Sequence, residues 1–207
     1  MDSGRDTVLG RIRDALADQP PAPEIPRGYR TTGHRSPTEV VELFVERVAE
    51  TGAVVMHAAD PAAAAAGALA ERGASRVTVA PDLDASLRPA GLEVVEDHDL
   101  PPAELDALDG AVTTCAAACA ETGTIAFDGG EGQGRRAITL VPDLHVCIVR
   151  PAQIVETVPE LFDGLAASAR EGRPVVLVSG PSATSDIELE RVEGVHGPRQ
   201  LVVVLQV

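Results

Sequence analysis

The first half of the chain switches between two hydrophobic periods, and this predicts helices that alternate with strands. The stretch 37–51 carries apolar side chains at every third or fourth position behind a capping box of Ser36 and Glu39, which is typical of an amphipathic helix. An alanine-rich helix is expected between Asp60 and Gly73. Three short, valine-rich runs are expected to be strands: 53–58, 76–81 and 92–96. Strands that alternate with helices of about 12 residues predict a mostly parallel sheet with helices over its faces.

The second half of the chain is richer in strands, and they follow one another more closely. The expected strands are 110–114, 123–127, 137–142, 145–150, 174–180 and 201–207. A short helical turn is expected at 115–119, and a helix is expected from Pro159 to Arg170. The close spacing of the strands in 123–150 predicts some antiparallel pairing. The predicted fold class is therefore α/β, with a mixed, mainly parallel sheet and helices on both faces.

The N-terminal part of the chain has a different pattern from the rest. Residues 5–18 predict a short amphipathic helix, and the next ten residues, 19–28, contain four prolines and predict an extended arm. We therefore expect an N-terminal helix and proline-rich arm over 1–30 and a single α/β domain over 31–207. The arm and the last hydrophobic strand are compatible with self-association.

Composition and charge exclude several classes of function. The 207 residues suit one domain with a small appendage, and 44% hydrophobic residues can fill its core. Seventeen basic and 32 acidic residues give a net charge of −15, which disfavours nucleic acid and anionic lipid as partners. All of the basic residues are arginine, so a P-loop lysine and a Schiff-base lysine are both excluded.

The sequence has the features of a cytoplasmic protein without a membrane span. Its N-terminal residues carry a charge every few positions, unlike a signal peptide, and no run of about 18 apolar residues is present. Cys115, Cys119 and Cys147 make no disulfide framework. Zinc and iron–sulfur sites commonly need about four ligands, so we expect no metal site and interpret these cysteines as small core residues.

The segment 121–124 is the first candidate site. Glu121 precedes Gly123 beside a predicted strand, where a glycine lets a ligand approach the backbone closely. Such a carboxylate can act as a base or as a nucleophile toward an acyl group. The alternative interpretation is a turn that Glu121 caps and Gly123 permits.

The nine-residue loop from Asp128 to Arg136 is the second candidate. Hairpin loops usually have about 2–5 residues, and longer loops in compact domains are often functional. Its four glycines can form a nest of backbone N–H groups, and Arg135 and Arg136 add donors suited to carboxylate or phosphate. The alternative is a solvated hairpin tip.

Two further segments carry polar residues near predicted strands. The run 179–188 follows an expected buried strand, where hydroxyls and a helix N-terminus can bind an anion, although Ser185 and Glu188 also fit a structural capping box. His196, between two glycines, can present its ring to a pocket or serve only as a turn residue. His145, at the start of a strand, has the same two interpretations.

Four motifs, in this order, resemble the lactate utilization protein C family, whose members carry a LUD domain. They are AETGTI (120–125), GQGRRAITLVPDLHVCIV (132–149), SGPSATSDIE (179–188) and VEGVHGPRQLVVVL (192–205). Cys119 stands where the family pattern is usually aliphatic, and Ser185 where it is usually alanine. The resemblance implies a fold similar to the sugar-phosphate isomerase and CoA-transferase superfamily.

The resemblance also implies a function: a non-redox component of L-lactate oxidation to pyruvate that acts beside iron–sulfur partner proteins and holds no cofactor itself. We expect its pocket to bind a small carboxylate or phosphate ligand, whose charge Arg135 and Arg136 would neutralise. Glu121 is the candidate catalytic residue. The candidate ligand-binding residues are Thr122, Gly123, Thr124, Gln133, Gly134, Arg135, Arg136, Ser179, Gly180, Ser182, Thr184 and His196.

Two other functions remain open at this point. One is a stand-alone acyl- or CoA-transferase, since Glu121 and Gly123 resemble the Glu-x-Gly turn of CoA transferases. The other is a ligand sensor without turnover.

Overall fold

The computed structural model describes residues 4–18, 23–185 and 191–207, and it divides into two compact units, Met1–Arg30 and Thr31–Val207. The first unit contains helix α1 (Gly4–Ala15), none of whose described residues is buried, followed from residue 23 by extended chain. Its apolar side chains Val8, Ile12 and Leu16 are exposed. The short N-terminal helix predicted from the sequence is therefore present.

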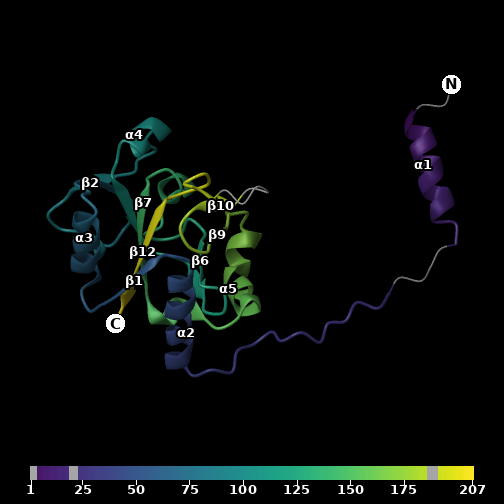
Figure 1. The fold of residues 1–207 in the computed structure, drawn as a ribbon, viewed down its shortest axis with the longest axis horizontal. Coiled ribbons are helices and arrows are strands. Elements are labelled where there is room, and N and C mark those ends of the chain that lie inside the picture. The colour runs from purple at the N-terminus through teal and green to yellow at the C-terminus, as the bar shows by residue number, and fades with distance from the viewer. Residues whose placement is uncertain (1–3, 19–22, 186–190) are drawn as a thin grey trace. The chain divides into compact units, whose positions relative to one another are not determined.

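The second unit is built on a six-stranded sheet whose neighbouring strands are all parallel (Figure 1). The order of its strands is β1 (Val54–Ala58), β12 (Gln200–Gln206), β7 (Leu144–Val149), β4 (Gly110–Thr113), β2 (Arg76–Val79) and β3 (Glu93–Glu96). The predicted fold class, α/β with a mainly parallel sheet, is confirmed.

Helices cover both faces of this sheet, as the sequence pattern predicted. Helix α3 (Pro61–Glu71) packs over β12 and β7 on one face, and helix α2 (Pro37–Glu50) lies on the other side of β12 (Figure 1). Successive side chains of a strand point to opposite faces, so Val202 and Val204 join the core under α3 while Leu201 and Val203 join the core under α2. The two cores hold the sheet between the helices.

A second sheet supplies the antiparallel pairing expected around residues 123–150. Its strand order is β8 (Ile154–Val155), β5 (Ala117–Cys119), β6 (Thr124–Phe127) and β9 (Val176–Val178). Strand β6 pairs antiparallel with both β5 and β9. Helix α5 (Val158–Arg170) packs against this sheet through Leu161 and Leu165.

The remaining elements are short connections. They are η1 (Ala85–Leu87), α4 (Pro102–Asp106), η2 (Arg136–Thr139), η3 (Pro151–Gln153) and the hairpin of β10 (Ala183–Ser185) and β11 (Arg191–Glu193). Among the helices in the described parts of the chain, none combines the length and apolar character needed to cross a bilayer.

Two local predictions were wrong. The helical turn expected at 115–119 is instead strand β5, because pairing with β6 and packing of Cys119 beneath α5 outweigh the helix preference of alanine. The strand expected at 137–142 begins as the 3₁₀ helix η2, whose Ile138 is buried in the core under α3. A short apolar run fits either structure by its pattern alone.

The expectation for 174–180 also changes. The strand there, β9, covers only Val176–Val178 and lies at the edge of the small sheet, where Leu177 is 45% exposed. The residues that follow it therefore do not lie at the carboxyl edge of the parallel sheet. Ser185 is the last residue of strand β10, and the capping box predicted for Ser185 and Glu188 extends outside the described residues.

Candidate functional site

The segment 121–124 joins the 179 segment through a chain of hydroxyl groups. Oγ1 of Thr124 lies 2.7 Å from Oγ1 of Thr122 and 2.7 Å from Oγ of Ser179. This contact joins two candidate segments that are far apart in the sequence. It is compatible with both a binding and a structural role.

Gly123 and Glu121 are placed by packing. Gly123 has φ +60°, and a Cβ there would lie 2.8 Å from the backbone carbonyl carbon of Arg47, at the end of α2. The half-buried Glu121 donates its backbone N–H to the carbonyl oxygen of Glu156 at 3.1 Å. Glu121 is not among the residues that line the cavities described below.

A small cavity of about 210 Å³ gathers several of the other candidates, and we call it the His145 cavity. Its polar lining residues are Thr139, His145, Ser179, Ser182 and His196, with the backbone of Gly180. The Ser182 hydroxyl accepts the backbone N–H of His196 at 2.9 Å, and its own N–H donates to Pro198 at 2.8 Å. The 179–182 and 196–198 segments are thus brought together, while the side chain of Thr184 is outside the described part.

His145, which the sequence offered with both a binding and a structural interpretation but which was not among the candidate ligand-binding residues, also lines this cavity. It is 1% exposed, and its Nε2 lies 2.8 Å from the Thr113 hydroxyl on the neighbouring strand β4. Burial lowers the pKa of His145 to about 4, so the ring is neutral at pH 7. Within the described part of the chain its Nδ1 has no hydrogen-bond partner. The signal in the sequence was a lone histidine in an otherwise apolar strand.

The glycine loop forms a second cavity of about 520 Å³, which we call the glycine-loop cavity. Its lining residues include Asp128, Gln133, Gly134, Arg135, Arg136, Thr139 and Arg173. Gly134 has φ +65°, and a Cβ there would lie 2.6 Å from the Ile138 side chain, so the loop packs tightly on the core. Thr139 lines both cavities, which therefore adjoin.

Asp128 organises this loop. Its carboxylate accepts bonds from Gln133 Nε2 at 2.9 Å, from Arg173 Nη1 at 2.9 Å and from the Ser168 hydroxyl. Burial alone would raise the pKa of Asp128, but the bonds from Ser168, Gln133 and Gly130 and the charge of Arg173 lower it below its ordinary value. Asp128 therefore stays a carboxylate and fixes the loop that carries the adjacent arginines.

The two adjacent arginines have different surroundings. Arg135 pairs with the buried Asp97 through Nε at 2.6 Å and Nη2 at 2.9 Å, and it also donates to the carbonyl oxygen of Leu100. Its charge is thus neutralised inside the protein. Arg136 is exposed, and within the described ranges no carboxylate lies within ion-pair distance of its guanidinium. Arg136 is therefore the member of the pair that is available to a ligand.

The described residues contain no group of three His, Cys, Asp or Glu side chains that could hold a metal ion. The arrangement instead provides hydroxyls, a neutral imidazole and one available guanidinium around two adjoining cavities. Such groups can orient a small polar anion through hydrogen bonds and charge.

Comparison with known proteins identifies relatives of this chain. The LUD domain family matches residues 102–206. The chain is 45% identical over 201 residues to lactate utilization protein C of Deinococcus radiodurans, covering 96% of this chain and 93% of that protein. It is 30% identical over 125 residues to lactate utilization protein C of Bacillus velezensis, covering 53% and 52%.

A solved structure gives the same assignment. The crystal structure of a DUF162 family protein from Deinococcus radiodurans superposes with a TM-score of 0.72 at 40% sequence identity. The match covers 83% of this chain and 99% of that one. The chain therefore belongs to the LUD domain family.

Proposed function

We propose that this protein is a component of a lactate utilization system and binds a small organic anion in the His145 and glycine-loop cavities. The observation that carries the proposal is the 45% identity to a lactate utilization protein C over 96% of the chain. A relationship of this extent includes both cavities and the N-terminal unit.

The geometry supports a ligand of a few atoms. The His145 cavity, at about 210 Å³, is below the roughly 300–1,000 Å³ of sites for drug-sized ligands. The hydroxyls of Ser179 and Ser182 and the free Nδ1 of His145 can bond the hydroxyl or keto oxygen of a 2-hydroxy or 2-oxo acid. Arg136, in the adjoining cavity, supplies the positive charge for the carboxylate.

The redox step is assigned in this proposal to other proteins. Oxidation of lactate to pyruvate releases two electrons and two protons, and the proposed electron acceptors are iron–sulfur clusters in partner proteins. In this scheme the chain holds no cofactor and supplies ligand binding and assembly. The name of the 45% identical relative supports a role in lactate utilization, and the division between this chain and its partners is part of the proposal.

Removal of the gene from its host tests the proposal. We expect the deletion strain to lose growth on L-lactate and to keep growth on pyruvate, because pyruvate enters metabolism after the oxidation step. Wild-type protein should restore growth, and Ser182→Ala should restore it less well. Wild-type growth of the deletion strain on L-lactate would contradict the proposal.

A further inference from the structure

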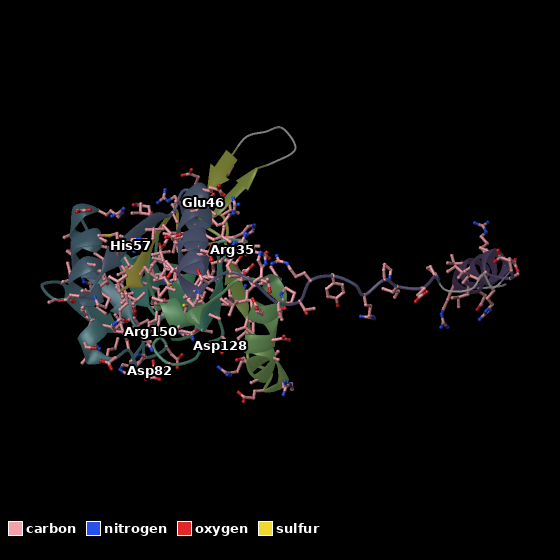
Figure 2. All side chains as sticks on the ribbon, turned by 90° about the horizontal axis from the view of Figure 1, so that it is seen from below. Arg35, Glu46, His57, Asp82, Asp128 and Arg150 are labelled. Carbon is pink, nitrogen blue, oxygen red and sulfur yellow. The ribbon has the colours of Figure 1, made fainter. Side chains whose placement is uncertain are left out.

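A third cavity, of about 570 Å³, adjoins the glycine-loop cavity, with which it shares the lining residue Gln133, and we call it the carboxyl-edge cavity. Its lining residues follow the ends of parallel strands: Asp84 comes after β2, Thr114 after β4, Arg150 after β7, and Gln206 ends β12. The glycine loop contributes Glu131. In Figure 2, Arg150 lies on the same side of the domain as Asp82 and Asp128, which border that loop.

The strand order places this cavity at a switch point of the sheet. From β2 the chain continues outward to β3, whereas from β4 it continues in the opposite direction to β7 and β12. In open α/β sheets, ligands bind outside the carboxyl ends of the strands where the direction reverses. Asp84 and Thr114 follow the two strands that flank this point.

Several polar groups around the cavity are available to a ligand. In the ranges that the structure describes, the Arg150 guanidinium, the Glu131 carboxylate and the Gln206 amide make no hydrogen bond or ion pair. Asp84 accepts bonds from the amide and hydroxyl of Ser86 through Oδ1 alone, and these bonds lower its pKa, with a smaller contribution from the charge of Arg150. The cavity therefore offers one cation, two carboxylates and an amide.

This set of charges selects a dipolar ligand. A simple anion would pair with Arg150 but would be repelled by the carboxylates of Asp84 and Glu131. A simple cation would pair with these carboxylates but would be repelled by Arg150. A molecule with a carboxylate and an ammonium group on one carbon satisfies both signs. We propose that the carboxyl-edge cavity binds a free α-amino acid, whose carboxylate pairs with Arg150 and whose ammonium group lies toward Asp84 and Glu131.

Isothermal titration of the full-length protein tests this proposal, which is independent of the proposed role in lactate utilization. The probes are L-alanine and L-glutamine, with L-lactate as the matched compound that replaces the ammonium group of alanine by a hydroxyl. We expect saturable binding of at least one amino acid, and we expect saturating L-lactate to leave its Kd unchanged.

Substitutions locate the site. Arg150→Gln and Glu131→Gln should each weaken amino acid binding at least tenfold, because each removes the partner of one ligand charge. The matched controls Arg170→Gln on α5 and Glu42→Gln on α2 remove the same charges elsewhere and should stay within twofold of wild type. Unchanged melting temperatures would show that the variants fold.

Two results would overturn the inference: no saturable heat with either amino acid, or an affinity that Arg150→Gln leaves unchanged. Failure of the lactate proposal gives a different pattern. In that case L-lactate would not bind wild-type protein or the Ser182→Ala variant, while amino acid binding and its dependence on Arg150 would persist.

Discussion

His145 is a buried residue that lowers the stability of the folded protein at acidic pH and also lines a cavity. A neutral imidazole in the interior needs a partner for its polar atoms, and Thr113 supplies one at Nε2. The ring also lines the His145 cavity, where the proposed ligand would meet it. Because the ring is buried, its protonation is strongly disfavoured in the folded protein.

The lowered pKa of His145 makes the free energy of unfolding depend on pH. Because the pKa of His145 is about 4 in the folded protein and about 6.5 in the unfolded chain, the unfolded state binds more protons between these values. Stability is therefore lost as pH falls from about 6.5 toward 4, by about 2 kcal/mol at pH 5. Urea unfolding of wild type and His145→Gln at pH 7 and pH 5 measures the difference.

The variant should lose this part of the pH dependence. The exposed His57 of β1 provides the control, and His57→Gln should keep the wild-type change between the two pH values. If His145→Gln and wild type lost stability equally, the neutral buried imidazole would be the wrong description of His145.

At the scale of elements, the sequence predicted regular helices and central strands well and two short segments of small or apolar residues, 115–119 and 137–142, poorly. The capping boxes of α2 and α5 and the valine runs of β2 and β12 are local signals, so their elements could be predicted. Strand β5 is made of alanine and cysteine, and only its pairing with β6 decides its conformation.

Some features of the candidate site could likewise be predicted from the sequence, and others could not. The chemistry of the Ser179, Ser182 and His196 segments could be anticipated from residue types, and they do meet around one cavity. The pairing of Arg135 with Asp97 could not, because the two residues lie 38 positions apart and meet only in the folded domain. The same holds for Arg150 and Gln206, whose proximity depends on strand order.

Substitution of Gly123 tests whether this glycine is needed for the close packing of its segment against α2. In Gly123→Ala the new Cβ would meet the backbone of α2 at a positive φ, so we expect a loss of at least about 2 kcal/mol in unfolding free energy. Gly164 in α5 has open space around it, and Gly164→Ala should gain about 0.5–1 kcal/mol. Denaturant melts of both variants provide the measurement, and equal stabilities would contradict the packing role.

At the scale of the whole molecule, the domain begins at an anchor around Glu156. This buried carboxylate accepts the backbone N–H groups of His34 and Arg35, both at 2.7 Å, and the Arg35 guanidinium at 2.7 Å. Gly33 lies so close that a Cβ there would be 2.3 Å from Glu156 Oε2. Glu156 thus holds the segment that leads into α2, together with Glu160, which accepts the backbone N–H of Gly33 at 2.9 Å.

We predict that Glu156→Gln loosens this segment. The amide NH₂ of glutamine would face one of the donors, so the variant should lose about 1–3 kcal/mol and be cleaved faster by trypsin after Arg35. Cleavage after Arg27, in the other unit, should keep its rate and serve as the internal reference. The matched control is Glu50→Gln on the surface of α2, and equal cleavage rates after Arg35 would rule out the anchor.

The position of β12 has a consequence for how the protein is made. This strand lies between β1 and β7. Val54 of β1 pairs with Val202, about 150 residues further along the chain. During synthesis on the ribosome, the edges of β1 and β7 that pair with β12 stay unpaired until residues 200–206 have left the exit tunnel. Nascent chains of this domain therefore expose an unpaired edge of β1 for most of translation and one of β7 in its last part, and a chaperone that covers these edges would raise the yield of folded protein.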